Sequence, residues 1–180
     1  MSFNSIPAAK DLNKITEDFN CIIEIPAESD PVKYEIEDDL VWVDRFVGTN
    51  MRYPANYGYI PQTLCDDGDA LDVLVVTPFP LIHGCVVRAR PLGVLNMTDE
   101  SGGDAKLVAV PVSKLCPMYD NIQSIDDLPE LLVKQIEFFF QNYKGLEKGK
   151  WVKLDGFGTK EDAEKEILKS LEMFNNKNNG

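Results

Sequence analysis

The 180-residue sequence has a single histidine, only four cysteines and fewer basic than acidic residues. No Cys-x-x-Cys pair is present, so we expect neither a structural zinc site nor a redox motif. We expect the four cysteines to be reduced thiols in a cytoplasmic protein. The histidine, His83, lies in a short turn, where a surface position is favoured over a role as nucleophile. The net charge of −12 argues against nucleic acid as a partner, because nucleic-acid binding depends on basic side chains.

The sequence also lacks a long apolar run. Its most apolar segment, residues 73–82, is interrupted by one threonine and two prolines, and residues 1–5 place no basic group before an apolar stretch. We therefore expect neither a membrane span nor a signal peptide. The composition, 44% apolar and 27% charged, predicts one globular domain over residues 1–180, with a frayed tail at 175–180.

Short β-rich runs fill the first two-thirds of the chain, and two helical patterns follow. We expect a helix that Asp127 caps, whose apolar positions continue to Tyr143, and a second helix that begins near Thr159. Short strands at this spacing favour a closed or nearly closed barrel, and two of them form a hairpin or meander around an acidic turn. The predicted strands are residues 21–25, 32–36, 40–44, 72–76, 85–90 and 106–110.

The strongest chemical signal is the segment Asp67-Gly-Asp69-Ala-Leu-Asp72, which leads directly into an apolar strand. Because aspartate is short, its carboxylate stays close to the backbone and offers the fixed oxygen geometry that magnesium needs. Taken alone, the segment fits an ordinary Asp-Gly turn equally well. It does not fit an EF-hand, because Asp72 stands where the sixth loop position requires glycine.

A second acidic segment contains Asp99, Glu100 and Asp104 and is followed by Lys106. Asp104 and Lys106 can face the same side of a strand, the carboxylate toward a metal ion and the ammonium group toward phosphate. Taken singly, these residues fit a polar surface. Together with the interleaved groups, they indicate a site for a metal complex of a small, highly charged phosphate. The interleaved residues are Glu24, Lys33, Glu35, Arg45, Tyr53, Tyr57, Tyr143 and Lys144.

The order of these motifs resembles the family I soluble inorganic pyrophosphatases, particularly the short bacterial form, over residues 6–174. One departure is Ala70, which stands where the family commonly has proline and would make the loop less rigid. The matching motifs are Glu24-Ile-Pro26, Lys33-Tyr-Glu35, Asp44-Arg45-Phe46, Tyr53-Pro-Ala-Asn-Tyr57-Gly-Tyr59, Asp67-Gly-Asp69-Ala-Leu-Asp72, Asp99-Glu100, Asp104-Ala-Lys106 and Tyr143-Lys144.

The resemblance implies an α+β, β-dominated fold with a five-stranded OB-like closed barrel flanked by two main helices. It implies magnesium-dependent hydrolysis of inorganic pyrophosphate to two orthophosphates, with several Mg²⁺ ions per active site and direct attack of a metal-activated water. Asp69 would be the general base. The metal network would comprise Asp67, Asp72, Asp99, Asp104 and Glu24, and the phosphate binders would be Lys33, Arg45, Tyr57, Lys106, Tyr143 and Lys144.

Two other hypotheses stay open at the level of sequence. One is a metal-dependent phosphatase or nucleotide pyrophosphohydrolase. The sequence has few aromatic or apolar groups free to hold the base of a nucleotide, which slightly disfavours this alternative. The other is a nonenzymatic calcium-binding or oligonucleotide-binding barrel. The resemblance further implies a homo-oligomer, with a hexamer favoured, and residues 138–140 give the first helix more apolar surface than one core-facing stripe needs.

Overall fold

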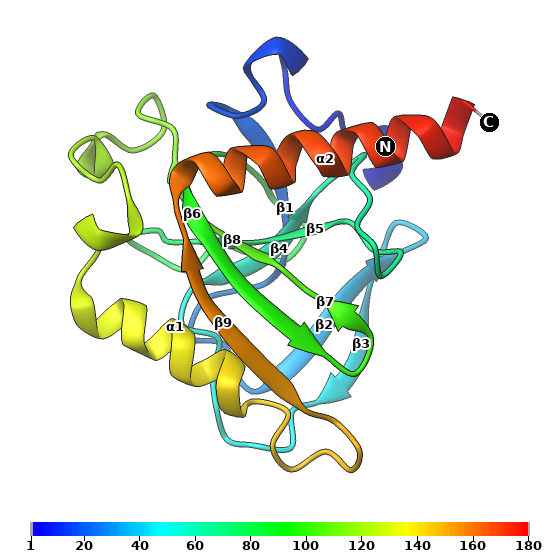
Figure 1. Cartoon of the computed structure of the whole chain (residues 1–180), viewed down its shortest axis with the longest axis vertical. Coiled ribbons are helices and arrows are strands. Elements are labelled where there is room, and N and C mark those ends of the chain that lie inside the picture. Colours follow the sequence, from blue (N-terminus) through cyan, green and yellow to red (C-terminus); the bar gives the residue numbers. More distant parts are fainter. Residues whose placement is uncertain (1, 180) are drawn as a thin grey trace.

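Five strands pair in a ring at the centre of the structure, a computed structural model that describes residues 2–179 (Figure 1). Each strand pairs with the next, and the last pairs again with the first. Only β5 and β8 run parallel to each other; the other neighbours in the ring are antiparallel. In ring order the strands are β1 (Phe19–Ile25), β4 (Asn56–Ile60), β5 (Leu71–Val75), β8 (Lys106–Pro111) and β6 (Val86–Asp99).

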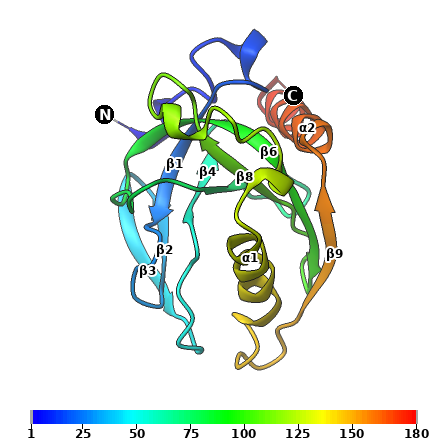
Figure 2. The same ribbon diagram turned by 90° about the vertical axis from the view of Figure 1, so that its left-hand side faces the viewer.

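Two helices cover the ring on different sides (Figures 1 and 2). Helix α1 (Glu130–Asn142) buries Ile136, Phe139 and Phe140 in one apolar cluster. Helix α2 (Lys160–Asn179) contributes Ala163 and Ile167 to a second cluster. The β-dominated α+β fold with two main helices is therefore confirmed. Within residues 2–179, neither helix has the combination of length and apolarity that crossing a membrane requires.

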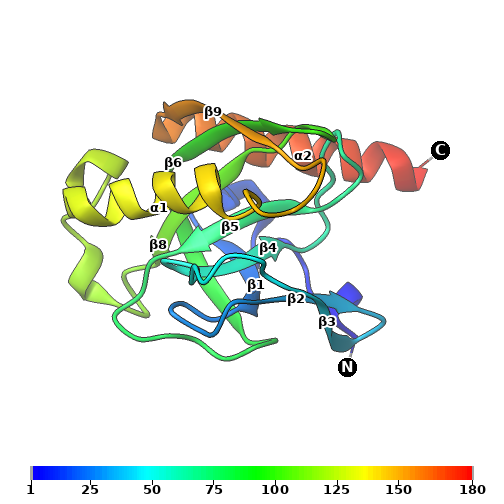
Figure 3. The same cartoon turned by 90° about the horizontal axis from the view of Figure 1, so that it is seen from below.

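A separate two-stranded sheet projects beside the ring, and Figure 3 shows it on the opposite side from α1. Strands β2 (Val32–Glu37) and β3 (Leu40–Phe46) form this hairpin, as the sequence predicts. Asp38 and Asp39, between the strands, have φ angles of 49° and 63°. Positive φ at both central residues is typical of a type I′ turn, whose twist matches that of the flanking strands.

Strand β4 was not predicted, because prolines and a glycine made its segment resemble a loop. In the structure Gly58 is required by packing: a Cβ atom there would lie 1.9 Å from the carbonyl oxygen of Ile22 on the neighbouring strand. A glycine inside a strand often marks such a close approach of two backbones. The short β7 (Gly102–Gly103) and β9 (Val152–Gly158) were likewise not predicted.

Strand β6 is longer than predicted. The sequence predicts a strand over residues 85–90, but β6 continues to Asp99 and pairs with β9 along its second half. Its pairing with β8 shifts register between Pro91 and Gly93. A bulge at this point accommodates the two residues that usually interrupt a strand.

The predicted cap of the first helix is wrong. Asp127 belongs to a preceding 3₁₀ turn (Ile125–Asp127), where its carboxylate accepts hydrogen bonds from the backbone N–H groups of Gln123 and Ser124. Helix α1 begins only at Glu130. The reason is Pro129, because a proline disfavours helical backbone in the residue before it, and Leu128 is extended, with ψ of 154°.

The second helix begins as predicted. Thr159 and Asp162 exchange hydrogen bonds around its first turn, with Thr159 N donating to Asp162 Oδ2 at 3.0 Å and Asp162 N donating to Thr159 Oγ1 at 3.2 Å. The helix continues through residues 175–179, where the sequence predicts fraying. No glycine or proline interrupts this stretch, and Gly180 lies outside the described residues. Fraying in solution stays a prediction.

Candidate active site

One cleft of about 500 Å³ is lined by every site residue that the sequence predicts. Its walls come from separate parts of the chain, namely β1, the β2–β3 hairpin, β4, the loop at residues 61–70, the end of β6, the start of β8 and the end of α1. The structure thus brings together Asp69, the acids Glu24, Asp67, Asp72, Asp99 and Asp104, and the candidate phosphate binders Lys33, Arg45, Tyr57, Lys106, Tyr143 and Lys144.

The parallel pairing of β5 and β8 places Asp72 directly opposite Lys106. Lys106 Nζ donates to Asp72 Oδ2 at 2.5 Å, to Asp104 Oδ1 at 2.7 Å and to Tyr57 Oη at 3.0 Å. Its side chain is only 4% exposed. Burial alone would lower the pKa of this lysine, but the adjoining Asp72, Tyr57 and Asp104 raise it well above its usual value. The buried ammonium group therefore stays charged.

Two basic residues of the hairpin are also held by acids. Lys33 Nζ lies 2.5 Å from Glu35 Oε1 and 3.0 Å from Asp44 Oδ2. Burial opposes the charge on Lys33, but these two carboxylates raise its pKa. Arg45 Nη1 lies 3.0 Å from Glu147 Oε2, in the turn between α1 and β9. Both cations thus face the cleft in defined positions.

Another ion pair, between Lys144 and Asp99, lines the side of the cleft next to α1. Lys144 Nζ lies 2.7 Å from Asp99 Oδ2, and the two side chains are 9% and 8% exposed. Nearby, Lys150 lies 2.7 Å from Glu100 Oε1. Although burial would raise the pKa of Glu100, hydrogen bonds from Lys150 and backbone amides, with the charge of Lys144, lower it to about 2.

The remaining acids repel one another. Burial, with the charges of Asp72 and Glu35, raises the pKa of Glu24 to about 8, even though the backbone N–H of Ile36 donates to its carboxylate. Asp69 lies on the exposed loop, and its pKa is raised by partial desolvation and by the charges of Asp67 and Asp72. Carboxylates in this condition favour an added cation among them.

The charge of the cleft fits divalent metal ions. Nine acidic and five basic side chains line it, so an anionic phosphate would meet a surplus of negative charge unless cations were added. The acids offer oxygen ligands only, as a hard ion such as magnesium prefers. No group of three or more His, Cys, Asp and Glu side chains in residues 2–179 is already drawn together around a metal position. Lysines instead neutralise several of the acids, as Lys106 does for Asp72 and Asp104.

Comparison with known proteins shows which family builds this cleft. The sequence model of the family described as inorganic pyrophosphatase matches residues 21–175. The chain belongs to the inorganic pyrophosphatase family. It is 63% identical to the inorganic pyrophosphatase of Ralstonia nicotianae over 176 residues, which cover 97% of this chain and 99% of the relative. It is 58% identical to that of Escherichia coli K12 over 179 residues, or 98% and 100% of the two chains.

Solved structures agree with the sequence comparison. A pyrophosphatase structure from Coxiella burnetii matches with a TM-score of 0.89 at 48% identity, covering 94% of this chain and 99% of the other. One from Thermus thermophilus matches with a TM-score of 0.89 at 38% identity, covering 97% and 99%. The predicted resemblance to the bacterial soluble inorganic pyrophosphatases is thereby confirmed, and with it the prediction of a hydrolase.

Some residues of the cleft were not predicted. Lys150 comes from the turn between α1 and β9. The sequence feature that could have indicated it is the pair Lys148 and Lys150, which flank Gly149. Tyr59 and Ser101 also line the cleft. His83 is exposed, as the sequence predicts, and its Nδ1 lies 2.8 Å from the carbonyl oxygen of Glu24.

Replacing Lys106 with methionine should destabilise the metal-free protein by about 3–5 kcal/mol, because the substitution leaves Asp72 and Asp104 without their buried cation. Lys134→Met is the matched control, since Lys134 pairs with Glu130 where the two side chains are 66% and 81% exposed. Thermal and denaturant unfolding in excess chelator measure both variants. Equal stability of the two would show that the Lys106 contacts contribute nothing.

Proposed function

We propose that this chain hydrolyses inorganic pyrophosphate to two orthophosphates with magnesium. The observation that carries the proposal is the joint presence, in one cleft of a member of this family, of acids suited to metal ions and of cations suited to phosphate. Pyrophosphate is small and highly charged, and no covalent attachment to the enzyme is needed to break its anhydride bond. The cleft has to supply positive charge, a fixed orientation and a proton acceptor.

The acids would hold several magnesium ions. Asp67, Asp72 and Asp104 would bind the first ion, Asp72 would be shared with a second, and Asp99 and Glu24 would complete the network directly or through water. When bound, magnesium neutralises phosphate charge and lowers the pKa of a coordinated water. Asp72 suits a shared position because it follows the acidic loop and lies opposite β8.

The basic and phenolic side chains would bind phosphate oxygens. The pKa values of Lys33, Lys106 and Lys144 are raised by neighbouring acids against the effect of burial, so these groups remain cations at neutral pH. Burial raises the pKa values of Tyr57 and Tyr143, so each phenol keeps its proton and can donate a hydrogen bond. Arg45 adds a planar donor from the hairpin side.

Asp69 would be the general base toward the attacking water. It lies on the same loop as Asp67, and its backbone N–H donates to Asp67 Oδ1 at 3.0 Å. Its carboxylate forms none of the ion pairs found within residues 2–179, whereas Asp72, Asp99 and Asp104 are each paired with a lysine. An unpaired carboxylate with a raised pKa is a better proton acceptor than one held by a lysine.

Three further features belong to the proposal. The return pairing of β1 with β6 supports an OB-like closed barrel as the form of the ring. The four cysteines are free thiols, in keeping with a cytoplasmic location. A hexamer is supported by exposed apolar side chains on α1, where Leu131 is 68% and Phe138 is 64% exposed beside a hollow of about 530 Å³. A monomeric mass in analytical ultracentrifugation at enzyme stock concentration would contradict the hexamer.

The activity is tested by measuring phosphate release from pyrophosphate, ATP and a phosphomonoester, each with magnesium and with excess chelator. Pyrophosphate should be the preferred substrate, and chelation should abolish its hydrolysis because the cleft otherwise repels it. Preferred hydrolysis of ATP or of the monoester would favour the organic-phosphate alternative. Full turnover in chelator would contradict the role of magnesium.

Asp69→Asn and Asp72→Asn should fail in different ways. Asparagine keeps the size of aspartate but cannot accept the proton, so Asp69→Asn should lower turnover by ~10²–10⁴-fold at any magnesium concentration. Asp72→Asn removes a charge from the metal network, so its main effect should be a higher magnesium requirement. A magnesium titration of both variants at saturating pyrophosphate makes the comparison. Equal rescue of the two variants by magnesium would refute this division of roles.

A further inference from the structure

The loop between β4 and β5, residues 61–70, carries Asp67 and Asp69 and leads directly to Asp72. Ile60 and Leu71, at its two ends, are register partners, so the loop is a hairpin connection. Most hairpin connections have about 2–5 residues, and strand pairing alone does not fix the path of a longer one. The geometry of the three carboxylates therefore depends on other contacts that hold this loop.

The tip of the loop is held by hydrogen bonds of its own. Cys65 N donates to the carbonyl oxygen of Asp69 at 2.7 Å, and Gly68 N donates to that of Cys65 at 3.0 Å. Together with the bond from Asp69 N to Asp67 Oδ1, these contacts fix Asp67 and Asp69 relative to each other. They do not join the tip to β5, where Asp72 lies.

The buried contact at the base of the loop is Thr63. Its side-chain Oγ1 donates to the carbonyl oxygen of Ile60 at 2.6 Å and accepts from the backbone N–H of Leu71 at 3.0 Å. One hydroxyl thus joins the end of β4 to the beginning of β5, next to Asp72. Thr63 is only 4% exposed. The preceding Gln62 has φ of 56°, a left-handed conformation that a residue other than glycine keeps only when its surroundings hold it.

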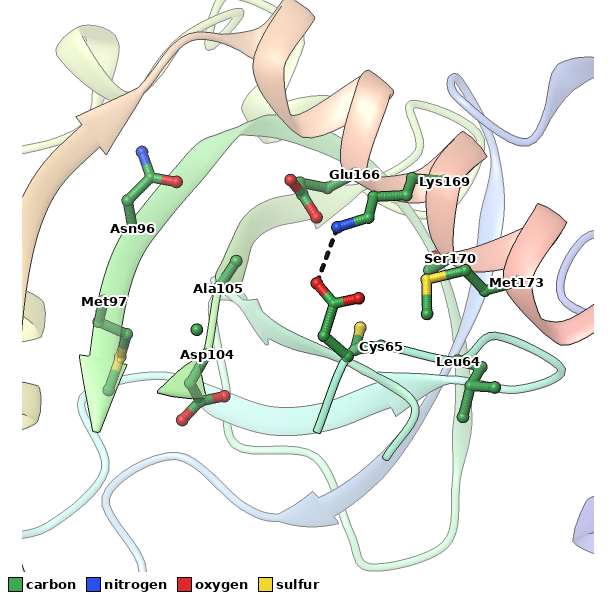
Figure 4. Close-up of a pocket in the computed structure, with 12 residues that line it drawn as sticks. Leu64, Cys65, Asn96, Met97, Asp104, Ala105, Glu166, Lys169, Ser170 and Met173 are labelled. Carbon is green, nitrogen blue, oxygen red and sulfur yellow. Dashed lines mark hydrogen bonds and ion pairs between the residues drawn. The ribbon is translucent and has the colours of Figure 1, made fainter. Parts of the chain in front are cut away.

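Helix α2 lies beside the outer side of the loop (Figure 4). Leu64 N donates to the carbonyl oxygen of Ser170 at 2.9 Å, and Lys169 Nζ lies 2.9 Å from Asp66 Oδ2. The ion pair is exposed to solvent, where such pairs contribute little. A hollow of about 190 Å³ lies beside these contacts, between α2 and Asp104. The bond to Ser170 holds the loop to α2, whereas Thr63 is the side chain that joins the loop to both strand ends.

We propose that Thr63 is a positioning residue for the acidic loop. Through Ile60 and Leu71, its hydroxyl determines where Asp67 and Asp69 lie relative to Asp72, although it lines no part of the cleft itself. A small displacement of a reacting group is enough to lower turnover strongly. This inference rests on the proposed function, in which Asp69 accepts the proton and the other two acids bind magnesium.

Thr63→Val tests the proposal, because valine keeps the shape of threonine and removes both hydrogen bonds; Thr63→Ser retains the hydroxyl. The matched control is Thr77→Val. Thr77 follows the other end of β5, where its Oγ1 donates to the carbonyl oxygen of Phe79 at 2.6 Å and accepts from Asn56 Nδ2 at 2.7 Å, away from the cleft. The readouts are kcat and KM for pyrophosphate with magnesium, thermal unfolding, and hydrogen exchange of the Leu71 amide in the metal-free protein.

Thr63→Val should lower kcat on the order of 10- to 10²-fold, while KM changes by less than about threefold, because the phosphate-binding cations stand on other elements. Exchange of the Leu71 amide should become faster. Thr63→Ser should restore both properties, and Thr77→Val should leave kcat unchanged. If the valine variant does not fold, Thr63→Ala, assayed below its unfolding temperature, makes the same comparison.

Normal kcat in a folded Thr63→Val or Thr63→Ala variant with fast Leu71 exchange would overturn the positioning role. The same loss in Thr63→Ser or in Thr77→Val would also overturn it, because loss of stability would then explain the effect. Near-normal turnover in Asp69→Asn has a different meaning. It would refute the proposed function of the loop, whatever the Thr63 variants show.

Discussion

The central constraint on this structure is an excess of acidic over basic side chains within one cleft. Nine carboxylates and five cations line it, and Asp99, Lys106 and Lys144 among them are buried. Each buried charge needs a partner, because an isolated ion in such surroundings is far less stable than one in water. The lysines supply that partner for Asp72, Asp99 and Asp104. The raised pKa values of Glu24, Asp69 and Asp104 show that the neutralisation is incomplete, at Asp104 even beside Lys106.

The ring of strands makes this confinement possible. Parallel pairing of β5 with β8 places Asp72 beside Lys106, two residues far apart in the sequence. The apolar residues of both strands are buried, so the strands that carry the two charged groups are held in the core. The hairpin and the end of α1 then add cations from other sides. The fold thus fixes charges that would otherwise separate.

The sequence predicted which residues gather in the cleft better than it predicted the strands that hold them. Site residues were recognisable because carboxylates, lysines and tyrosines recur in a distinctive order, and all of them line one cleft. The strands were harder to predict, because glycine and proline usually interrupt a strand. Here Gly58 lies where two strand backbones approach closely, and Pro91 lies at a bulge. The pairing of Asp72 with Lys106 could not be predicted either, since register between distant strands depends on the whole ring. The same holds for Thr63, whose role depends on where two strand ends meet.

Under the proposed function, divalent ions would take over the neutralisation of the acids in the cleft, and the lysines would then bind phosphate. Lys106 now makes its contacts with Asp72 and Asp104, the acids proposed to hold magnesium. A divalent ion between these carboxylates would compete with the ammonium group for the same oxygens. Lys106 would then be free to donate to an anion, and the net charge of the cleft would become less negative. In the proposed function, metal and phosphate binding should therefore support each other, since nine acids face five cations in the cleft and lysines such as Lys106 are paired with acids.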